Sequence, residues 1–96
     1  NFIGSDLKNS NLQGANLEST IFQNSQLQKV VFIAAHLSGA NFQGAHIEGA
    51  DFTKSLGLTQ SMIEKAHGDE TTLLPEGILI PEHWINKEVL EENEGE

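Results

Sequence analysis

The sequence predicts an all-β solenoid in which the chain bends after every five residues, followed by a short helix and an extended segment. Every fifth position holds a large apolar residue, which we call the centre of its unit. A small residue stands two places before most centres, and Gly, Asn or Ser stands two places after most of them. The centres include all five phenylalanines of the chain. They are Phe2, Leu7, Leu12, Leu17, Phe22, Leu27, Phe32, Leu37, Phe42, Ile47 and Phe52.

A period of five fits neither regular secondary structure. On an α-helix, five residues rotate by about 500°, so successive centres are about 140° apart and form no single stripe. On a flat strand, an odd spacing sends successive centres to opposite faces. A repeat of this length therefore indicates a chain that bends after each unit, so that every centre points toward one axis.

The residues around the centres support this interpretation. The inward position two places before the centre is small in nearly every unit, because a second inward side chain has less room. Those residues are Ser5, Ser10, Ala15, Thr20, Ser25, Val30, Ala35, Ala40, Ala45 and Ala50. The position two places after the centre is mostly Gly, Asn or Ser, which tolerate the geometry of a tight corner. The positions directly beside the centre are mostly polar and are expected to face solvent.

The segments "GANLES" (14–19), "GANFQG" (39–44) and "GADFTK" (49–54) resemble the repeats of the pentapeptide-repeat family, whose units read approximately Ala-Asp/Asn-Leu-X-X. The resemblance covers residues 1–55. It implies a right-handed quadrilateral parallel β-helix with four units, or about 20 residues, per square coil, and hence roughly three coils.

Four-sided coils would stack the centres in four columns. The columns are Phe2/Phe22/Phe42, Leu7/Leu27/Ile47, Leu12/Phe32/Phe52 and Leu17/Leu37. Phenylalanine occurs only in the first and third columns, which would lie on opposite sides. Rings from these two sides could then fill the middle of the core while aliphatic side chains close the other two sides.

The repeat ends at Gly57, where the next centre would stand. Thr59 is a candidate N-cap for a short helix over about 59–67, with Leu58 and Ile63 as a hydrophobic staple and Gly68 as its stop. Pro75 and Pro81 predict an extended path after it. We therefore divide the chain into a repeat β-helix (1–55), a cap (56–84) and a flexible acidic tail (85–96).

Parts of the cap are similar to the C-terminal segment of many bacterial pentapeptide-repeat proteins. The matching residues are Gly57 to Thr59, Gly68-Asp69, Thr72, Leu74 to Gly77 and Pro81 to Trp84. A solenoid leaves its last coil exposed, so a capping role has a physical reason. Nothing comparable precedes Phe2, and we expect further repeats or another domain upstream in the natural protein.

The charge distribution argues against some functions. The net charge is −9. Residues 1–55 hold three lysines and four acids (−1), and residues 56–96 hold two lysines and ten acids (−8). With five basic residues in total, direct nucleic-acid binding is not expected. The absence of cysteine excludes disulfides, and no apolar run reaches the roughly 20 residues of a membrane span. We expect no membrane contact; the sequence leaves the compartment open, with a cytoplasmic location favoured.

No residue pattern predicts catalysis, a cofactor or a metal site. His36 and His46 point outward on opposite sides of a square coil, so they could not share an ion, and His67 and His83 show no tight ligand spacing. Ser5 lies at an inward position that packing explains, as do Ser10 and Ser25. No pairing of a nucleophile with a base is visible. The sequence therefore predicts a protein that is not an enzyme.

Two functional classes remain. The first is a structural or protein–protein interaction module with an unknown protein partner. The second is suggested by the family resemblance: a DNA-mimicking inhibitor of a type II topoisomerase (gyrase), although the repeat region carries a net charge of only −1.

Three outward apolar residues, Ile21, Val31 and Ile33, form a possible interaction patch. The residues Leu73-Leu74 or Ile78–Ile80 could cover Val31 and Ile33, or the patch could mediate a homodimer; the sequence leaves both open. The stretch "QKVVFIAAHL" (28–37) also predicts the most regular β-strand of the prism.

Overall fold

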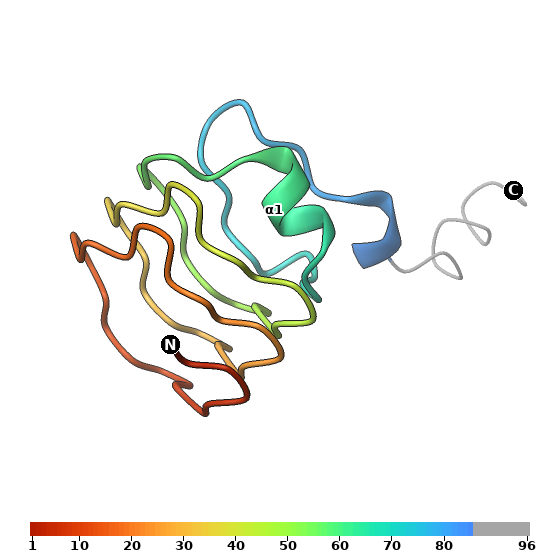
Figure 1. The fold of residues 1–96 in the computed structure, drawn as a ribbon. Coiled ribbons are helices and arrows are strands. Elements are labelled where there is room, and N and C mark those ends of the chain that lie inside the picture. Colours follow the sequence, from red (N-terminus) through yellow and green to blue (C-terminus); the bar gives the residue numbers. More distant parts are fainter. Residues whose placement is uncertain (86–96) are drawn as a thin grey trace, which may run out of the picture.

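A computed structural model describes residues 1–85 of the chain. Apart from Ile85, the predicted acidic tail lies outside them. Residues 1–57 form a stack of flat coils, with helix α1 (Gln60–Glu64) and the 3₁₀ turn η1 (Glu82–Trp84) following at its C-terminal end (Figure 1).

Parallel bridges join residues that are 20 apart, such as Asp6 to Gln26 and Gln26 to His46. Because each unit has five residues, four units complete one coil. We number the four sides by their centres. Side 1 holds Phe2, Phe22 and Phe42; side 2 holds Leu7, Leu27 and Ile47; side 3 holds Leu12, Phe32 and Phe52; side 4 holds Leu17 and Leu37.

Each side is too short for a continuous strand. Within residues 1–85, one residue per side is bridged, and the next turn begins two residues later. The prediction of a particularly regular strand around Val31 is therefore wrong. Val31 is bridged to Asn11 and Asp51, as its counterparts on other sides are bridged to theirs. The turns alternate with these bridges too closely for any side to extend.

The corners are turns that close on the centres. The backbone N–H of the residue three places after a centre donates to the carbonyl of that centre, as Ser5 does to Phe2 at 3.0 Å. The predicted corner residues all have positive φ, between 58° and 73°, which confirms their role. Six of them are not glycine, including Lys29 and Ala34. The left-handed region costs such residues about 1–2 kcal/mol each, which the stacked hydrogen bonds must offset.

The preference for Asn or Asp before the centre has a structural cause. The Asn11 side-chain oxygen accepts the backbone N–H of Gln13 at 3.0 Å, which holds the start of the turn. This is an Asx turn, a motif that short polar side chains favour. The same bond joins Asn1 to Ile3, Asp6 to Lys8, Asn16 to Glu18, Asn41 to Gln43 and Asp51 to Thr53.

The core is a double stack of phenylalanine rings. Rings within one column are nearly parallel, with centroids 4.8 to 5.6 Å apart. Rings from sides 1 and 3 meet edge to face at 5.7 to 6.0 Å. Both arrangements suit the charge distribution of aromatic rings. Most centres are buried, Leu7 and Leu12 at the first coil are half-buried, and Phe2 is 36% exposed.

Helix α1 begins as predicted but ends earlier. The Thr59 hydroxyl caps it by accepting the backbone N–H of Met62 at 3.2 Å. The helix ends at Glu64 rather than near residue 67, because the chain rejoins the coil. The Lys65 carbonyl accepts from Gly44 at 2.9 Å, and the His67 backbone donates to Ala45 and accepts from Ile47, both at 2.8 Å.

Gly68 is not the stop of the helix, because it lies beyond the helix end and its φ is not positive. It lies next to His67 on side 2, where a centre would follow Ile47. Added to Gly68, a Cβ would lie 2.6–2.7 Å from three atoms of the Trp84 ring. The missing side chain is thus replaced by the indole, whose Nε1–H donates to the Ala66 carbonyl at 3.1 Å.

The cap also continues side 3. The Leu73 N–H donates to Ala50 at 2.9 Å, and the Leu73 carbonyl accepts from Phe52 at 2.7 Å. The buried Thr72 hydroxyl donates to the Ile47 carbonyl at 2.9 Å. The C-terminal end is therefore closed partly by two further sides of coil and partly by α1 and Trp84.

Candidate functional site

Val31 and Ile33 lie on the outer surface of side 3, one on each side of the buried Phe32, and both are half-buried. Ile21 is also half-buried but lies on side 1, bridged to Asn41. Sides 1 and 3 are opposite each other, so the structure does not bring Ile21 together with Val31 and Ile33. We call Val31 and Ile33 the side 3 patch.

The side 3 patch interrupts a column of Asx turns. Val31 is bridged to Asn11 in the first coil and to Asp51 in the third. Asn11 and Asp51 each accept the backbone N–H two residues later, and the Asp51 oxygen also accepts the Thr53 hydroxyl at 2.7 Å. Valine has no oxygen for this bond. In the second coil, side 3 therefore lacks the Asx-turn hydrogen bond and presents two apolar side chains on its outer surface.

The cap does not fold back over the patch. Leu74 and Ile78 pack against the core instead. Leu73 is 50% exposed on side 3 and is bridged to Asp51, which separates it from Val31. The Leu79 backbone is bound at both its N–H and its carbonyl by the Gln60 side chain of α1, at 2.9 and 2.8 Å. The suggested covering by Leu73-Leu74 or Ile78–Ile80 is therefore wrong within residues 1–85.

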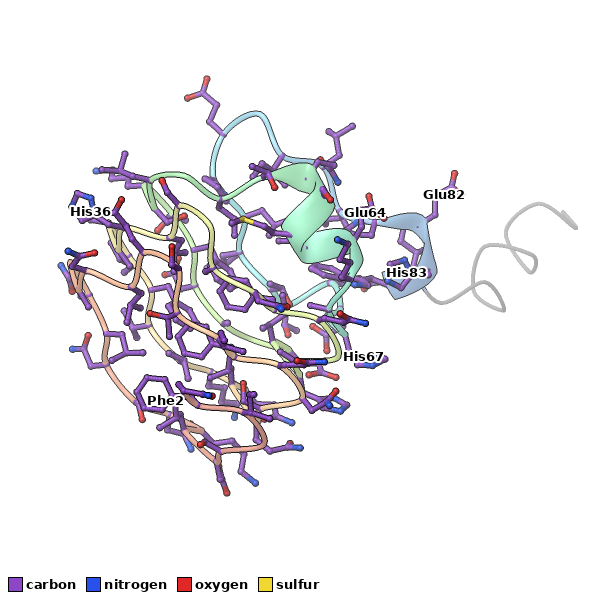
Figure 2. The ribbon with its side chains drawn as sticks, viewed as in Figure 1. Phe2, His36, Glu64, His67, Glu82 and His83 are labelled. Carbon is purple, nitrogen blue, oxygen red and sulfur yellow. The ribbon has the colours of Figure 1, made fainter. Side chains whose placement is uncertain are left out.

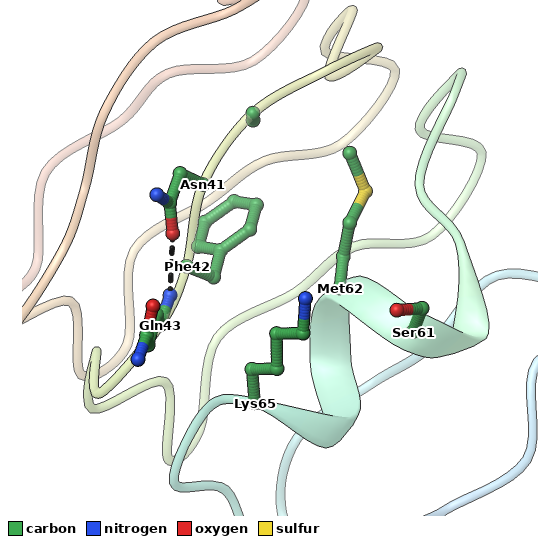
Figure 3. Close-up of a pocket in the computed structure, with 7 residues that line it drawn as sticks. Asn41, Phe42, Gln43, Ser61, Met62 and Lys65 are labelled. Carbon is green, nitrogen blue, oxygen red and sulfur yellow. Dashed lines mark hydrogen bonds between the residues drawn. The ribbon is translucent and has the colours of Figure 1, made fainter.

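A small pocket of about 150 Å³ lies between the third coil and α1 (Figure 3). Phe42 and Met62 provide its apolar part, and Gln43 and Lys65 provide polar groups at its edge. Ligand pockets usually enclose about 300–1,000 Å³, so this one is small for an organic ligand. It marks an imperfect fit between the helix and the coil.

The histidines are arranged differently from the prediction. His36 and His46 lie on opposite sides, as expected, but the His67 ring stacks on His46 with centroids 4.8 Å apart. His46 Nδ1 lies 3.4 Å from a Glu48 carboxylate oxygen. The repeat spacing does not predict this pair, because stacked residues are normally 20 apart, whereas the segment with helix α1 places His67 21 residues after His46.

Within residues 1–85, no group of three or more His, Cys, Asp or Glu residues could hold a metal ion. No helix in this part of the chain is long and apolar enough to cross a membrane. His83, in the cap, lies 3.9 Å from a Glu64 carboxylate oxygen, and both side chains are about half exposed (Figure 2). Such a pair contributes little to stability.

The architecture defines the class of the protein: a solenoid of five-residue units with regular outer faces. The family description "Pentapeptide repeats (8 copies)" matches residues 1–34 and 22–55, which is more than half of the chain. The chain belongs to the pentapeptide-repeat family. Such repeats imply a quadrilateral β-helix, in agreement with the four-sided coil. No curated protein gives a significant match.

Proposed function

We propose that the protein is a non-enzymatic interaction module that binds another protein through side 3. The observation that carries this proposal is the side 3 patch, where Val31 and Ile33 together flank one centre at outward positions that most other units fill with polar residues. A position that breaks the repeat pattern and loses a turn hydrogen bond has a cost, and such departures are often found at functional sites.

The backbone of side 3 supports this role. The Val31 backbone is bound to the first coil at both polar groups: its N–H donates to the Ser10 carbonyl at 2.9 Å, and its carbonyl accepts the Leu12 N–H at 2.7 Å. A surface fixed in this way loses little conformational entropy on binding. The complementary partner would place an apolar side chain between Val31 and Ile33, with polar groups facing Gln13 and Thr53.

The double variant V31N/I33Q tests the proposal, because it turns residues 31–33 into Asn-Phe-Gln, the sequence already found at 41–43. We expect the fold to be kept or slightly stabilised, by up to about 1 kcal/mol, through a new Asx turn. Proteins captured by the wild-type chain are purified, and their affinities for both chains are measured by calorimetry. Binding should fall at least tenfold in the variant.

Ile21→Asn is the matched control, because it introduces the same residue at the equivalent position on the opposite side. It should leave the affinity unchanged. Equal binding by the wild-type and V31N/I33Q chains would show that side 3 is not the binding surface.

The gyrase alternative has a separate test. DNA mimicry requires acidic groups along the prism, and residues 1–55 sum to −1. We expect no effect of the protein in a gyrase supercoiling assay. Stoichiometric inhibition would replace the interaction proposal with the alternative.

A further inference from the structure

The outer surface of side 3 carries more than the side 3 patch. Val31 is bridged to Asp51, and Asp51 is bridged to Leu73, so these residues form one column through the second coil, the third coil and the cap. Leu73 is 50% exposed, while its neighbour Leu74 packs against the core. An acidic residue therefore stands between two outward apolar positions.

The carboxylate of Asp51 is only partly used by the fold. Its Oδ1 accepts the Thr53 N–H at 2.9 Å and the Thr53 hydroxyl at 2.7 Å. The other oxygen makes no hydrogen bond or ion pair within residues 1–85. Asn11 and Asn41 make the same turn bond without a charge, so the turn requires an oxygen but not a carboxylate. The negative charge of Asp51 is thus available for a contact outside the fold.

The corners beside side 3 also depart from the repeat pattern. In residues 1–55 the corner position holds glycine, asparagine or serine except at Lys29, Ala34 and Lys54, and all three of these border side 3. Both lysines are exposed and have positive φ, 61° and 60°, which is unfavourable for a residue with a long side chain. Backbone strain of this kind is concentrated at functional sites. The unusual corners place one lysine at each edge of side 3.

The spacing of the column selects the shape of a partner. Neighbouring coils are about 4.8 Å apart, so Val31, Asp51 and Leu73 lie at about 0, 5 and 10 Å along the prism. Residues i, i+4 and i+7 of an α-helix share one face at about 0, 6 and 10.5 Å. Successive same-face residues of a strand are about 7 Å apart and do not coincide with the column. An α-helix that lies along the prism therefore matches it.

We propose that side 3 binds an α-helix of another protein that carries a basic residue between two apolar ones. The proposal rests on the function proposed above and specifies the partner of the same surface. One apolar residue of the helix packs on the side 3 patch, a second packs on Leu73, and an arginine or lysine between them pairs with Asp51. Acidic residues on the two flanks of the helix face Lys29 and Lys54, as charges flank the apolar contact in coiled coils.

A designed peptide is the probe. It is an alanine-based helix with leucine at positions i and i+7, arginine at i+4 and glutamate on both flanks, and the control peptide has glutamine in place of the arginine. Each peptide is titrated to millimolar concentration into the full isotope-labelled chain, and NMR chemical shifts give the binding site and the affinity. The arginine peptide should shift the backbone signals of side 3. It should bind about fivefold more tightly than the control, as expected for a single charge pair.

Asp51→Asn removes the charge and keeps the turn, because asparagine makes the same bond at Asn41. Its affinity for the arginine peptide should fall to that of the control peptide, and the salt dependence of binding should decrease. Asp6→Asn is the matched control, because Asp6 accepts the Lys8 N–H at 3.1 Å in an identical Asx turn on side 2. It should leave the affinity unchanged.

The second apolar contact has its own pair of variants. Leu73→Gln should weaken binding of the arginine peptide about fivefold, because it removes the apolar side chain at one end of the column. Leu56→Gln should have no effect, since Leu56 is 54% exposed at the equivalent outward position on side 4.

The outcomes separate this proposal from the one on which it rests. A captured protein that loses affinity for V31N/I33Q but binds Asp51→Asn as tightly as the wild type would confirm side 3 as the surface and contradict the basic helix. Equal affinity of the two peptides, or no shift of side 3 signals at millimolar peptide, would also overturn the basic helix. Peptide binding that is equal for the wild-type and V31N/I33Q chains would contradict both proposals.

Discussion

The first and the last coil of the prism differ in how far residues 1–85 cover their core side chains. At the C-terminal end the chain itself covers the core, and Phe42 is 1% exposed; at the N-terminal end nothing in residues 1–85 does so, and Phe2 is 36% exposed. Identical residues in one column thus differ only in what lies beyond them. In a solenoid, the burial of a side chain depends on the next repeat more than on its own unit.

The closed end also shows that a cap must break the repeat pattern. A further regular unit would place another exposed centre above the last coil. Instead, Gly68 has no side chain, and Trp84 from a separate segment occupies the vacated space. Ile63 of α1 is buried in the same core. The side chains that close the end therefore come from outside the five-residue register.

The largest expected effect comes from truncating a phenylalanine of the side 1 column, compared between the third and the first coil. Phe42→Ala removes a fully buried ring that contacts three other rings, and should lower the free energy of unfolding by about 3–5 kcal/mol. Phe2→Ala removes a partly exposed ring, and should cost about 1 kcal/mol. Urea denaturation measures both. Equal costs would mean that Phe2 is packed as tightly as Phe42, in contradiction to its 36% exposure.

Trp84→Ala should cost about 3 kcal/mol, because it removes a buried indole and its hydrogen bond to Ala66. Trp84 is the only tryptophan, so the blue-shifted fluorescence of the folded wild type reports its burial directly. Leu79→Ala is the control: Leu79 lies in the same segment but is 75% exposed, and its loss should change stability by less than about 0.5 kcal/mol. A similar cost for both variants would argue that Trp84 does not close the end.

Gly68→Ala should cost about 1–3 kcal/mol by overpacking, because the new methyl group collides with the Trp84 ring. In the double variant with Trp84→Ala, most of this cost should disappear. Gly14→Ala provides a contrast in the first coil. Its added Cβ meets no atom within 4 Å, so it should cost only the strain of φ +69°, about 1–2 kcal/mol. Additive costs for the Gly68 and Trp84 variants would contradict direct packing between them.

The smallest effect concerns Thr72, whose buried hydroxyl bonds the Ile47 carbonyl at 2.9 Å. Thr72→Val should lower stability by about 1 kcal/mol, because the carbonyl loses its partner away from water. Thr71→Val changes the neighbouring exposed threonine, whose hydroxyl donates to the Asp69 carboxylate; because water can replace this exposed bond, the variant should be almost neutral. Thermal unfolding of both variants measures the difference. A neutral Thr72→Val would show that the bond from Thr72 to Ile47 does not stabilise the cap.

Much of the repeat could be predicted from sequence because its information is local and repeated. The five-residue period, the small inward residues and the positive-φ corners are each defined within a single unit, and eleven units repeat them. The Thr59 cap of α1 is also a local signal. The cap geometry was harder to predict, because it depends on residues distant in sequence: Gly68 packs against Trp84, and His46 stacks on His67.

The candidate surface divides in the same way. The outward orientation of Val31 and Ile33 follows from the period alone. That residues 56–85 leave this patch uncovered could not be deduced, because Leu73, Leu74 and Ile78 are all apolar and could have packed on either surface. Their final positions depend on the backbone hydrogen bonds of the cap to the third coil.

The sequence by itself therefore determined the solenoid, its columns of centres and its corners, since a short period leaves each residue one possible direction. Only the tertiary structure decided how the last coil of the repeat is covered. This covering depends on side chains of the cap that reach the last coil from positions distant in the sequence. A local pattern contains no information about such contacts.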